Sequence, residues 1–324
     1  MILPEPVVLA AGVVSSATPI ILAVIGETIT EKAGVINLSL DGTILLSAMV
    51  SFVVASQTGN LILATIAAAM VGGSIAGGIA FFSLYGRVSQ VAIGFIMALM
   101  AKDAAYFLGN AYARINGPQF GDSGIPLLRD LPFVGPVLFD HNILVYVGLL
   151  LIPFSSWLLY STRAGLNLRA IGENPLACYA RGLSPRPYQV MAAIMGGALV
   201  GISGAAFSLC FKPGWGRPQG AEGTGWIVLA LVIFGGWNPI RASVGAYFFA
   251  MLQIIAIHLQ TRFDQLPATI FQIAPFPLMI STLLLIQVFK KGQQRKNTGR
   301  PGFGGRITDI LWGAAPASLG KTFL

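Results

Sequence analysis

The sequence predicts an all-α, polytopic membrane protein, and its composition, its hydrophobic runs and its basic residues all support this fold class. Of its 324 residues, 55% are hydrophobic and 10% are charged, and the mean hydropathy is +0.76. A soluble domain carries about 25% charged residues. Because this chain carries far fewer, it cannot cover a water-facing surface of its size, and its apolar surface requires lipid. Its 39 glycines are typical of helices that approach closely within a bilayer.

Nine apolar stretches are candidates for membrane spans. A span needs about 20 mainly apolar residues, because each residue adds about 1.5 Å across about 30 Å of hydrocarbon. The candidates are residues 6–25, 37–56, 60–83, 88–109, 142–160, 188–210, 224–238, 241–260 and 267–289. The stretch 224–238 is short, and the stretch 37–56 contains polar residues that suggest a broken or re-entrant helix. We therefore expect about nine transmembrane helices, within a range of eight to ten. The first run has no basic region before it and is expected to be a retained span.

The Lys and Arg residues indicate how these spans are oriented. With nine spans and a cytoplasmic C-terminus, the loop 161–187 is cytoplasmic, and the loops 110–141 and 211–223 are external. The basic residues that then fall outside are few, as the positive-inside rule requires: Arg114, Arg129, Lys212, Arg217 and Arg262. We therefore interpret the net charge of +8 as a result of the orientation of the spans in the membrane. We expect membrane lipids as neighbours of the basic residues and no nucleic acid partner. We divide the chain into a transmembrane domain, residues 1–289, and a basic cytoplasmic tail, residues 290–324.

The cytoplasmic loop 161–187 carries the clearest local structural signal in the chain. Asn174 and Pro175 fit the N-cap and the first position of a helix, because asparagine accepts hydrogen bonds from free helix N–H groups and proline has no N–H to leave unpaired. Gly182 fits the left-handed residue that ends a helix. We therefore expect a short, capped helix of about two turns over residues 176–181.

This short helix is a candidate docking element. Ala177 and Ala180 would keep one surface low enough to enter a groove of a partner, and Glu173 and Arg181 would make contacts at the rim. The alternative is an ordinary loop that obeys the positive-inside rule. That alternative explains the arginines, but it does not explain a helix with both ends capped.

A second informative segment, residues 26–48, brings polar residues into an apolar stretch. Glu27 and Glu31 lie near the cytoplasmic edge. Asn37 and Asp41 follow, four residues apart, and we expect them to share one face of a helix. Polar groups within a membrane are costly and usually face a cavity or a partner helix. We interpret Asn37 and Asp41 as residues that line a pathway; the alternative is an interfacial helix start that Asp41 caps.

The sequence predicts no catalytic, metal or cofactor site. Cys178, Cys210, His141 and His258 are isolated from one another and fit no metal-ligand spacing. No nucleophile and base are arranged in a pattern that suggests hydrolysis. We therefore expect a protein that is not an enzyme.

Two further patterns are given structural interpretations. Residues 315–322 resemble the phosphate-binding loop GxxxxGK[ST], but Ala315 replaces the first glycine and no strand precedes it, so we expect no ATP binding. Lys102 and Asp103 interrupt the fourth span near its outer end, where Lys102 can extend to the membrane interface. We prefer that interpretation to a proton relay, which would need several buried acids or histidines.

Three segments, in order, resemble motifs of permease subunits of bacterial ABC importers for nucleosides and simple sugars. GETITEKAGVINLSLDG matches the first motif at Gly26, Glu27, Glu31, Gly34, Asn37, Leu38, Asp41 and Gly42. RAGLNLRAIGENPLACYARGL matches the coupling motif at Gly165, Arg169, Ala170, Gly172, Asn174, Pro175, Ala177 and Gly182. GTGWIVLALVIFGGWNPIRASVGAYFFA, residues 223–250, resembles a later motif. Lys32, Tyr179 and Arg241 depart from the usual family residues, and the resemblance covers most of residues 15–290.

The resemblance implies an ABC importer permease fold and a multi-pass subunit in a bacterial inner membrane, with no cofactor. It implies three protein partners: an ATP-binding subunit that hydrolyses ATP, a second permease subunit in a heterodimer or a homodimer, and an external substrate-binding lipoprotein. The residues implied in coupling to the ATPase are Gly172, Glu173, Asn174, Pro175, Ala177, Ala180, Arg181 and Gly182. Asn37 and Asp41 would belong to the translocation pathway.

Two other classes of function are consistent with a helical membrane protein. A secondary carrier driven by an ion gradient would need no ATPase partner and should transport when reconstituted alone. A structural scaffold would transport nothing in any assembly. The capped cytoplasmic helix and the lack of an ATP-binding motif favour a permease that a separate ATPase drives.

Overall fold

The computed structural model describes residues 5–121, 124–126, 128–217, 219–262, 277, 281 and 315–321. In this part of the chain the regular structure is helical, as predicted, and seven helices are long and apolar enough to cross a membrane. They are α1 (Glu5–Lys32), α2 (Leu40–Thr58), α3 (Leu61–Gly86), α4 (Gln90–Gly109), α5 (Ile143–Ser161), α8 (Pro185–Ala206) and α10 (Pro239–Arg262). The shorter segments are η1 (Asn110–Tyr112), η2 (Gly135–Phe139), α6 (Arg163–Glu173), α7 (Pro175–Ala180), η3 (Phe207–Phe211) and α9 (Thr224–Phe234).

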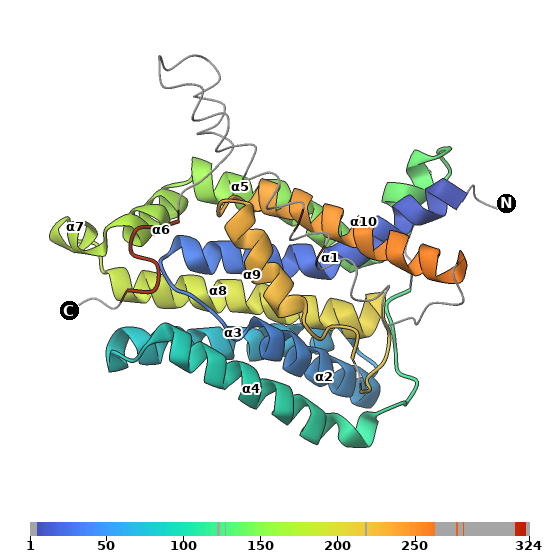
Figure 1. The fold of residues 1–324 in the computed structure, drawn as a ribbon, viewed down its shortest axis with the longest axis horizontal. Helices are drawn as coiled ribbons and strands as arrows, with labels where there is room; N and C mark the ends of the chain where they lie inside the picture. The colour runs from blue at the N-terminus through green and yellow to red at the C-terminus, as the bar shows by residue number, and fades with distance from the viewer. Residues whose placement is uncertain are drawn as a thin grey trace, which may run out of the picture.

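The long helices lie side by side in one bundle, with α1 and α8 running through its middle (Figure 1). α8 packs along α3 and along α1, and α2 packs against α3, α4 and α8. α5 and α10 both pack against α1. Helices α6 and α7, within the loop predicted to be cytoplasmic, lie at the opposite end of the bundle from η2, within the loop predicted to be external.

Glycines set the distance between the central helices. A Cβ atom at Gly72 would lie 2.1 Å from the carbonyl oxygen of Gly197, and one at Gly201 would lie 2.1 Å from the carbonyl oxygen of Ala68. Lipid gives helices no hydrophobic reason to associate, so close backbone contacts between small residues are a main source of packing energy in a bilayer. The α3–α8 contact therefore depends on the absence of side chains at these positions.

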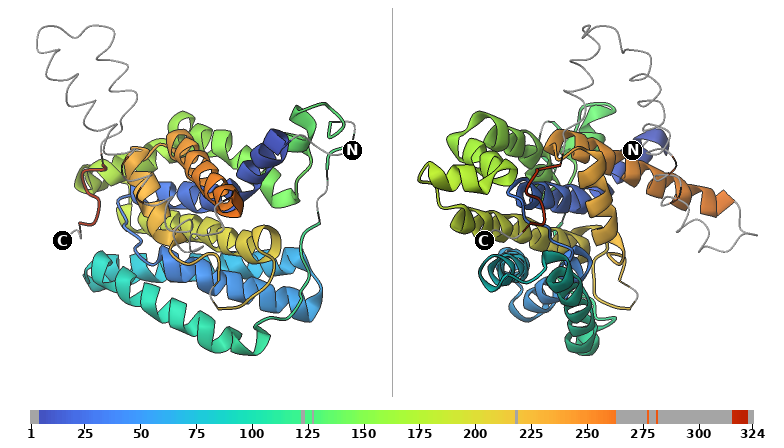
Figure 2. Two further views of the ribbon diagram at one scale, coloured as in Figure 1. Left: turned by 45° about the vertical axis from the view of Figure 1, so that its right-hand side comes forward. Right: turned by 60° about the vertical axis from the view of Figure 1, so that its left-hand side comes forward.

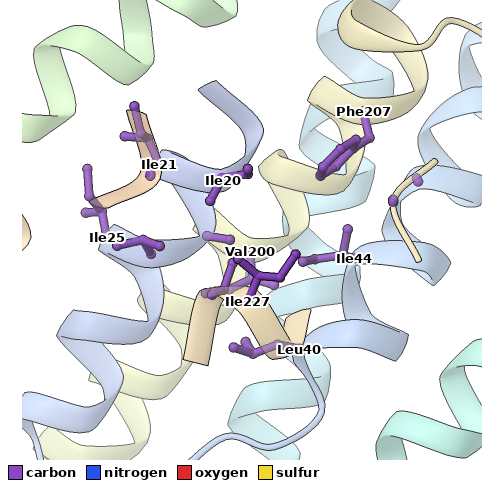
Figure 3. Close-up of a cluster of buried hydrophobic side chains, with 14 of the residues drawn as sticks. Ile20, Ile21, Ile25, Leu40, Ile44, Val200, Phe207 and Ile227 are labelled. Atoms are coloured by element: carbon purple, nitrogen blue, oxygen red, sulfur yellow. The ribbon is translucent and has the colours of Figure 1, made fainter. Parts of the chain in front are cut away.

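A cluster of buried apolar side chains joins α1, α2, α8, η3 and α9 (Figure 3). Its members include Ile20, Ile21, Ile25, Leu40, Ile44, Val200, Phe207 and Ile227. Leu40 is the first residue of α2, and Ile227 lies in the first turn of α9. The beginnings of α2 and α9 are therefore packed in the core of the bundle.

Two non-helical segments lead to these buried helix starts. Residues 33–39 follow α1 without helical structure, and residues 212–223 connect η3 to α9. A Cβ atom at Gly225 would lie 2.1 Å from the backbone nitrogen of Asp41, so the two helix starts touch. Figure 1 shows that α9 begins partway along the bundle, and α9 contacts α1. Its 11 residues cover about 16 Å, about half the hydrocarbon thickness.

Six of the predicted spans are confirmed, two differ from the prediction, and one is not tested because it lies almost wholly outside the described residues. The stretches that each correspond to one long helix are 6–25, 60–83, 88–109, 142–160, 188–210 and 241–260. The stretch 37–56 becomes helical only at Leu40, and the helix within 224–238 is shorter than a span. The stretch 267–289 lies outside the described residues except at two positions. The described part of the chain thus holds seven candidate spans, and the predicted total of nine is not established.

We predict that Gly201→Ala lowers the stability of the purified protein by about 3 kcal/mol, because the added methyl group would meet backbone atoms of Ala68 that cannot rotate away. Thermal unfolding in detergent would measure the loss. Gly78→Ala on α3 is the matched control, because a Cβ atom there meets nothing within 4 Å. Equal unfolding temperatures for the two variants would show that the α3–α8 contact is not this tight.

Candidate functional site

The short helix α7 has both ends capped, as the sequence predicts. The side-chain oxygen of Asn174 accepts a hydrogen bond from the Ala177 N–H at 3.0 Å. At the other end, Gly182 has φ +84° and its N–H donates to the carbonyl oxygen of Tyr179 at 2.9 Å. The helix begins at Pro175, one residue before the predicted start, and its caps are confirmed.

The outward surface of α7 carries two large side chains, Leu176 and Tyr179, for which the sequence predicted no docking role. Leu176 is 64% exposed and Tyr179 is 71% exposed, whereas Cys178 is buried. Ala177 and Ala180 are exposed between and beside them. The surface therefore combines positions with small side chains and two projecting apolar side chains. Exposed apolar side chains at the end of a bundle mark a surface that a partner can cover.

A cavity of about 480 Å³ lies beside α7. Its lining residues are Tyr85, Pro175, Leu176, Tyr179, Ser184, Pro185, Arg186 and Pro187. The Arg186 guanidinium lies 5.5 Å from the centre of the Tyr85 ring, a cation–π distance that links α8 to the end of α3. The α7 region thus offers both a projecting surface and a concave one, with Glu173 and Arg181 exposed at its edges.

Helix α6, which leads into α7, rests directly on the end of α1. A Cβ atom at Gly172 would lie 2.1 Å from the carbonyl oxygen of Lys32. On the other side, the buried Gln189 of α8 donates from Nε2 to the carbonyl oxygen of Ala33 at 2.9 Å. The turn after α1 is therefore held between α6 and α8, which flank α7 in the chain.

The segment 315–321, interpreted above as an incomplete phosphate-binding loop, packs onto the same place. Ser318 is buried; its Oγ donates to the carbonyl oxygen of Gly172 at 2.5 Å, and its N–H donates to the same oxygen at 3.0 Å. The Gly320 N–H donates to the carbonyl oxygen of Gly34 at 3.2 Å. Figures 1 and 2 place this segment beside α6. No local sequence signal predicts this contact, because its partners are far apart in the chain.

Asn37 and Asp41 do not share a helical face, which corrects our expectation. Asn37 precedes the helix, and its Oδ1 accepts hydrogen bonds from the N–H of Ser39 at 3.1 Å and from its hydroxyl at 2.6 Å. This local side-chain bonding competes with helix formation and explains the later helix start. Asp41 instead accepts a hydrogen bond from the Gly225 N–H at 3.3 Å, and both Asn37 and Asp41 are buried.

The glutamates of α1 stabilise the non-helical backbone that surrounds this break. Glu27 Oε1 accepts a hydrogen bond from the Asn37 N–H at 3.2 Å. Glu31 Oε2 accepts one from Trp237 Nε1, in the turn between α9 and α10. Trp237 follows Gly236, and both residues have positive φ. The paired glycines before Trp237 were a signal for this turn, but its partner on α1 could not be read from the sequence.

Lys102 has a long-range partner that the sequence analysis missed. Its Nζ lies 3.9 Å from Glu222 Oε2, in the segment that leads to α9. Lys102 lies near the middle of the helical run Gln90–Tyr112, and its predicted place near the outer end of the span stays a prediction.

The seven candidate spans of the described residues, the two buried helix starts and the capped helix at one end of the bundle fit a membrane transport permease. Over residues 9–288 the chain matches the family model described as branched-chain amino acid transport system / permease component. The chain belongs to this family. The resemblance to ABC transporter permeases is thereby confirmed, and the chain is a non-catalytic, multi-pass subunit of a multi-subunit ABC system.

Curated relatives cover most of the chain. A putative glucose ABC transporter permease protein of Haloferax volcanii is 34% identical over 76% of each chain. A nucleoside ABC transporter permease protein of Lactococcus lactis is 28% identical over 86% of this chain and 92% of its own. A guanosine ABC transporter permease protein of Bacillus subtilis is 27% identical over 82% of this chain and 88% of its own. No solved structure matches the chain significantly.

We predict that Ser318→Leu releases the segment 315–321 from α6, because leucine cannot donate to the Gly172 carbonyl oxygen and is too large for the buried site. Hydrogen exchange should then increase about tenfold or more at the backbone of residues 170–183, corresponding to about 1.4 kcal/mol of lost protection. Lys321→Gln, at an exposed position of the same segment, is the control and should leave exchange unchanged. Unchanged exchange in Ser318→Leu would mean that the segment does not support α7.

Proposed function

We propose that this chain is one of two permease subunits that together enclose the pathway of an ATP-driven importer for nucleosides or simple sugars. The observation that carries the proposal is the capped helix α7, with Leu176 and Tyr179 projecting from it, supported by Gly172 on the end of α1. The substrate class follows from the relatives, which are named for glucose, nucleosides and guanosine. The capped helix α7 at one end of the bundle and the starts of α2 and α9 in its core support this proposal.

The proposed partners are an ATP-binding subunit, a second permease subunit and an external substrate-binding lipoprotein. The ATP-binding subunit would dock on α7 and its neighbouring cavity, with Glu173 and Arg181 at the rim. The second permease, identical to this chain or different from it, would complete the pathway. We place the assembly in the bacterial inner membrane, with α7 and the tail 290–324 on the cytoplasmic side.

We propose that α7 passes the movement of the ATPase to the spans. Asn174, Pro175 and Gly182 make α7 a short rigid body, since a flexible loop would absorb the movement. Gly172 then contacts the end of α1 without an intervening side chain, and α8 follows α7 closely in the chain. A shift of α7 would therefore move α1 and α8 together, and these two helices form the middle of the bundle.

We propose that Asn37 and Asp41 act at the pathway. Because they do not share a helical face, we propose that they act through the contact between the starts of α2 and α9. The Asp41 carboxylate connects α2 to α9 through the Gly225 N–H. Non-helical backbone at membrane depth is tolerated where it is buried in protein or lines a water-filled cavity. A break of this kind is where transporters place substrate contacts.

An ion-gradient-driven carrier is the alternative function, and reconstitution separates the two. The carrier would accumulate substrate when the purified chain is reconstituted alone with an ion gradient. The importer would require the ATPase, the second permease and the binding protein, and would hydrolyse ATP as it transports. The three relatives described above are named as ABC transporter permease proteins, and these names favour the importer.

We predict that the double variant Leu176→Ala, Tyr179→Ala weakens binding of the ATP-binding subunit by about 30-fold or more, because removal of buried interface anchors costs about 2 kcal/mol or more. Co-purification and substrate-stimulated ATP hydrolysis would measure the loss. Membrane insertion should be unchanged, because no span is altered. Leu166→Ala, which removes an exposed apolar side chain of α6, is the control. Normal ATPase binding by the double variant would exclude α7 as the docking element.

We predict that Asp41→Leu reduces uptake at least tenfold while the assembled complex is retained, because leucine cannot accept the Gly225 hydrogen bond that joins the two helix starts. A tenfold change corresponds to about 1.4 kcal/mol, close to the lower end of the range of about 1.5–3 kcal/mol for a hydrogen bond to a charged group. Asp41→Asn is the matched variant, because it keeps an acceptor oxygen of the same reach, and it should retain most of the uptake. Equal uptake by Asp41→Leu and the unsubstituted chain would exclude this role.

A further inference from the structure

Charged side chains are exposed in the middle of a predicted span. Lys102 and Asp103 lie near the centre of the helical run Gln90–Tyr112, and Asp103 is exposed. The side chain of Lys102 is 36% exposed, and that of its partner Glu222 is 32% exposed. The proposed coupling mechanism does not use any of these three residues.

The neighbouring contacts fix the depth of this ion pair. Ala98, one turn before Lys102 on α4, packs against Gly42 in the first turn of α2. Gly225, which follows Glu222 closely in the chain, packs against Asp41. The Lys102–Glu222 pair therefore lies at the level where the helices α2 and α9 begin, which is the level of the break in the bundle.

Lipid cannot be the neighbour of this face. Charged side chains within a membrane span are costly, and they almost always face water-filled cavities or protein. The distance of 3.9 Å between Lys102 Nζ and Glu222 Oε2 exceeds the length of a charge-assisted hydrogen bond, about 2.8 Å. Both groups therefore keep hydrogen-bonding capacity that a ligand or water can use.

The same two segments carry an aromatic and cationic cluster one turn further along α4. Tyr106 lies four residues after Lys102, and its ring centre is 5.7 Å from that of Trp215. The Arg217 guanidinium lies 4.8 Å from the centre of the Tyr106 ring. This face of α4 and the segment 212–223 is thus polar and aromatic over more than one turn, unlike a surface built for lipid.

Helix α9 extends this open face beyond the ion pair. Trp226 is 45% exposed and Ile233 is 52% exposed, and the partly exposed Ala230 lies between them at helical spacing. Figure 1 shows α9 on the near side of the bundle, uncovered by another labelled helix. A short helix that starts in the core and remains open along one side is accessible from a space next to the bundle.

We propose that Lys102 and Glu222 form a substrate-contact site on the wall of the translocation pathway, for an uncharged ligand rich in hydroxyl groups. The ammonium group donates to hydroxyl or carbonyl oxygens, and the carboxylate accepts from hydroxyl groups. An ion pair has no net charge, so it suits a neutral nucleoside or sugar and does not require a charged one. The proposal rests on the proposed importer function and adds the residues that contact the cargo.

The first test uses the complete importer in proteoliposomes with guanosine as the probe. Lys102→Gln and Glu222→Gln should each lower guanosine uptake per ATP hydrolysed at least tenfold, while ATP hydrolysis stimulated by the loaded binding protein persists. The charge-exchanged double variant Lys102→Glu, Glu222→Lys separates contact from structure. It should remain defective if the groups contact substrate in a fixed orientation, and full recovery of uptake would overturn the proposal in favour of a structural ion pair.

A second test measures access of water to this face. Trp226→Cys should react with a positively charged, membrane-impermeant thiol reagent in the assembled importer, above the labelling of the unsubstituted chain. Leu150→Cys, at a 69% exposed position of α5, is the lipid-facing control and should not react. Lack of reaction at both positions would overturn the proposal.

The experiments distinguish a wrong importer function from a wrong assignment of the substrate-contact residues. If the unsubstituted importer does not take up guanosine or glucose in the complete assembly, the proposed function fails. If it takes up guanosine and both glutamine variants transport normally, only the assignment of Lys102 and Glu222 fails.

Discussion

Close contact between backbones at glycine is the constraint on which the rest of this structure depends. Gly72 and Gly201 bring α3 against α8 in the bundle, Gly225 brings α9 against α2 at the break, and Gly172 brings α6 against α1 at the end of the bundle that carries α7. At each place a side chain would meet backbone atoms, which cannot rotate away. In lipid, where burial of apolar surface does not drive helices together, this contact also supplies the packing energy.

The break in the bundle is possible because its polar backbone groups have partners. Unpaired N–H and C=O groups within a membrane cost several kcal/mol each, so non-helical segments must be satisfied by the protein. Glu27 accepts from the N–H of Asn37, Asp41 accepts from that of Gly225, and Glu31 accepts from the indole of Trp237. The acidic residues of the first motif thus stabilise the buried starts of α2 and α9 and the turn that follows α9.

The spans and α7 could be predicted from the sequence because their signals are local. The contacts between distant parts of the chain could not. Asn174 and Gly182 cap α7 through atoms within a few residues, so composition and spacing were enough. The predicted start of α2 is too early, because the spacing of hydrophobic residues gives no information on the hydrogen bonds that Asn37 accepts from Ser39. The partners of Ser318 and Lys102 lie more than a hundred residues away, and only the folded bundle brings them together.

These contacts form a continuous connection from the end of the bundle that carries α7 to the middle of the bundle. α6 touches the end of α1 at Lys32, the short segment 33–39 leads to α2, and Asp41 joins α2 to α9 at Gly225. Glu222 lies just before that point and faces Lys102 on α4. Because the segment 33–39 is short and largely buried, it cannot absorb a large displacement. A movement of α7 therefore has a physical route to the ion pair, and an importer needs such a route if ATP binding is to change the pathway at its centre.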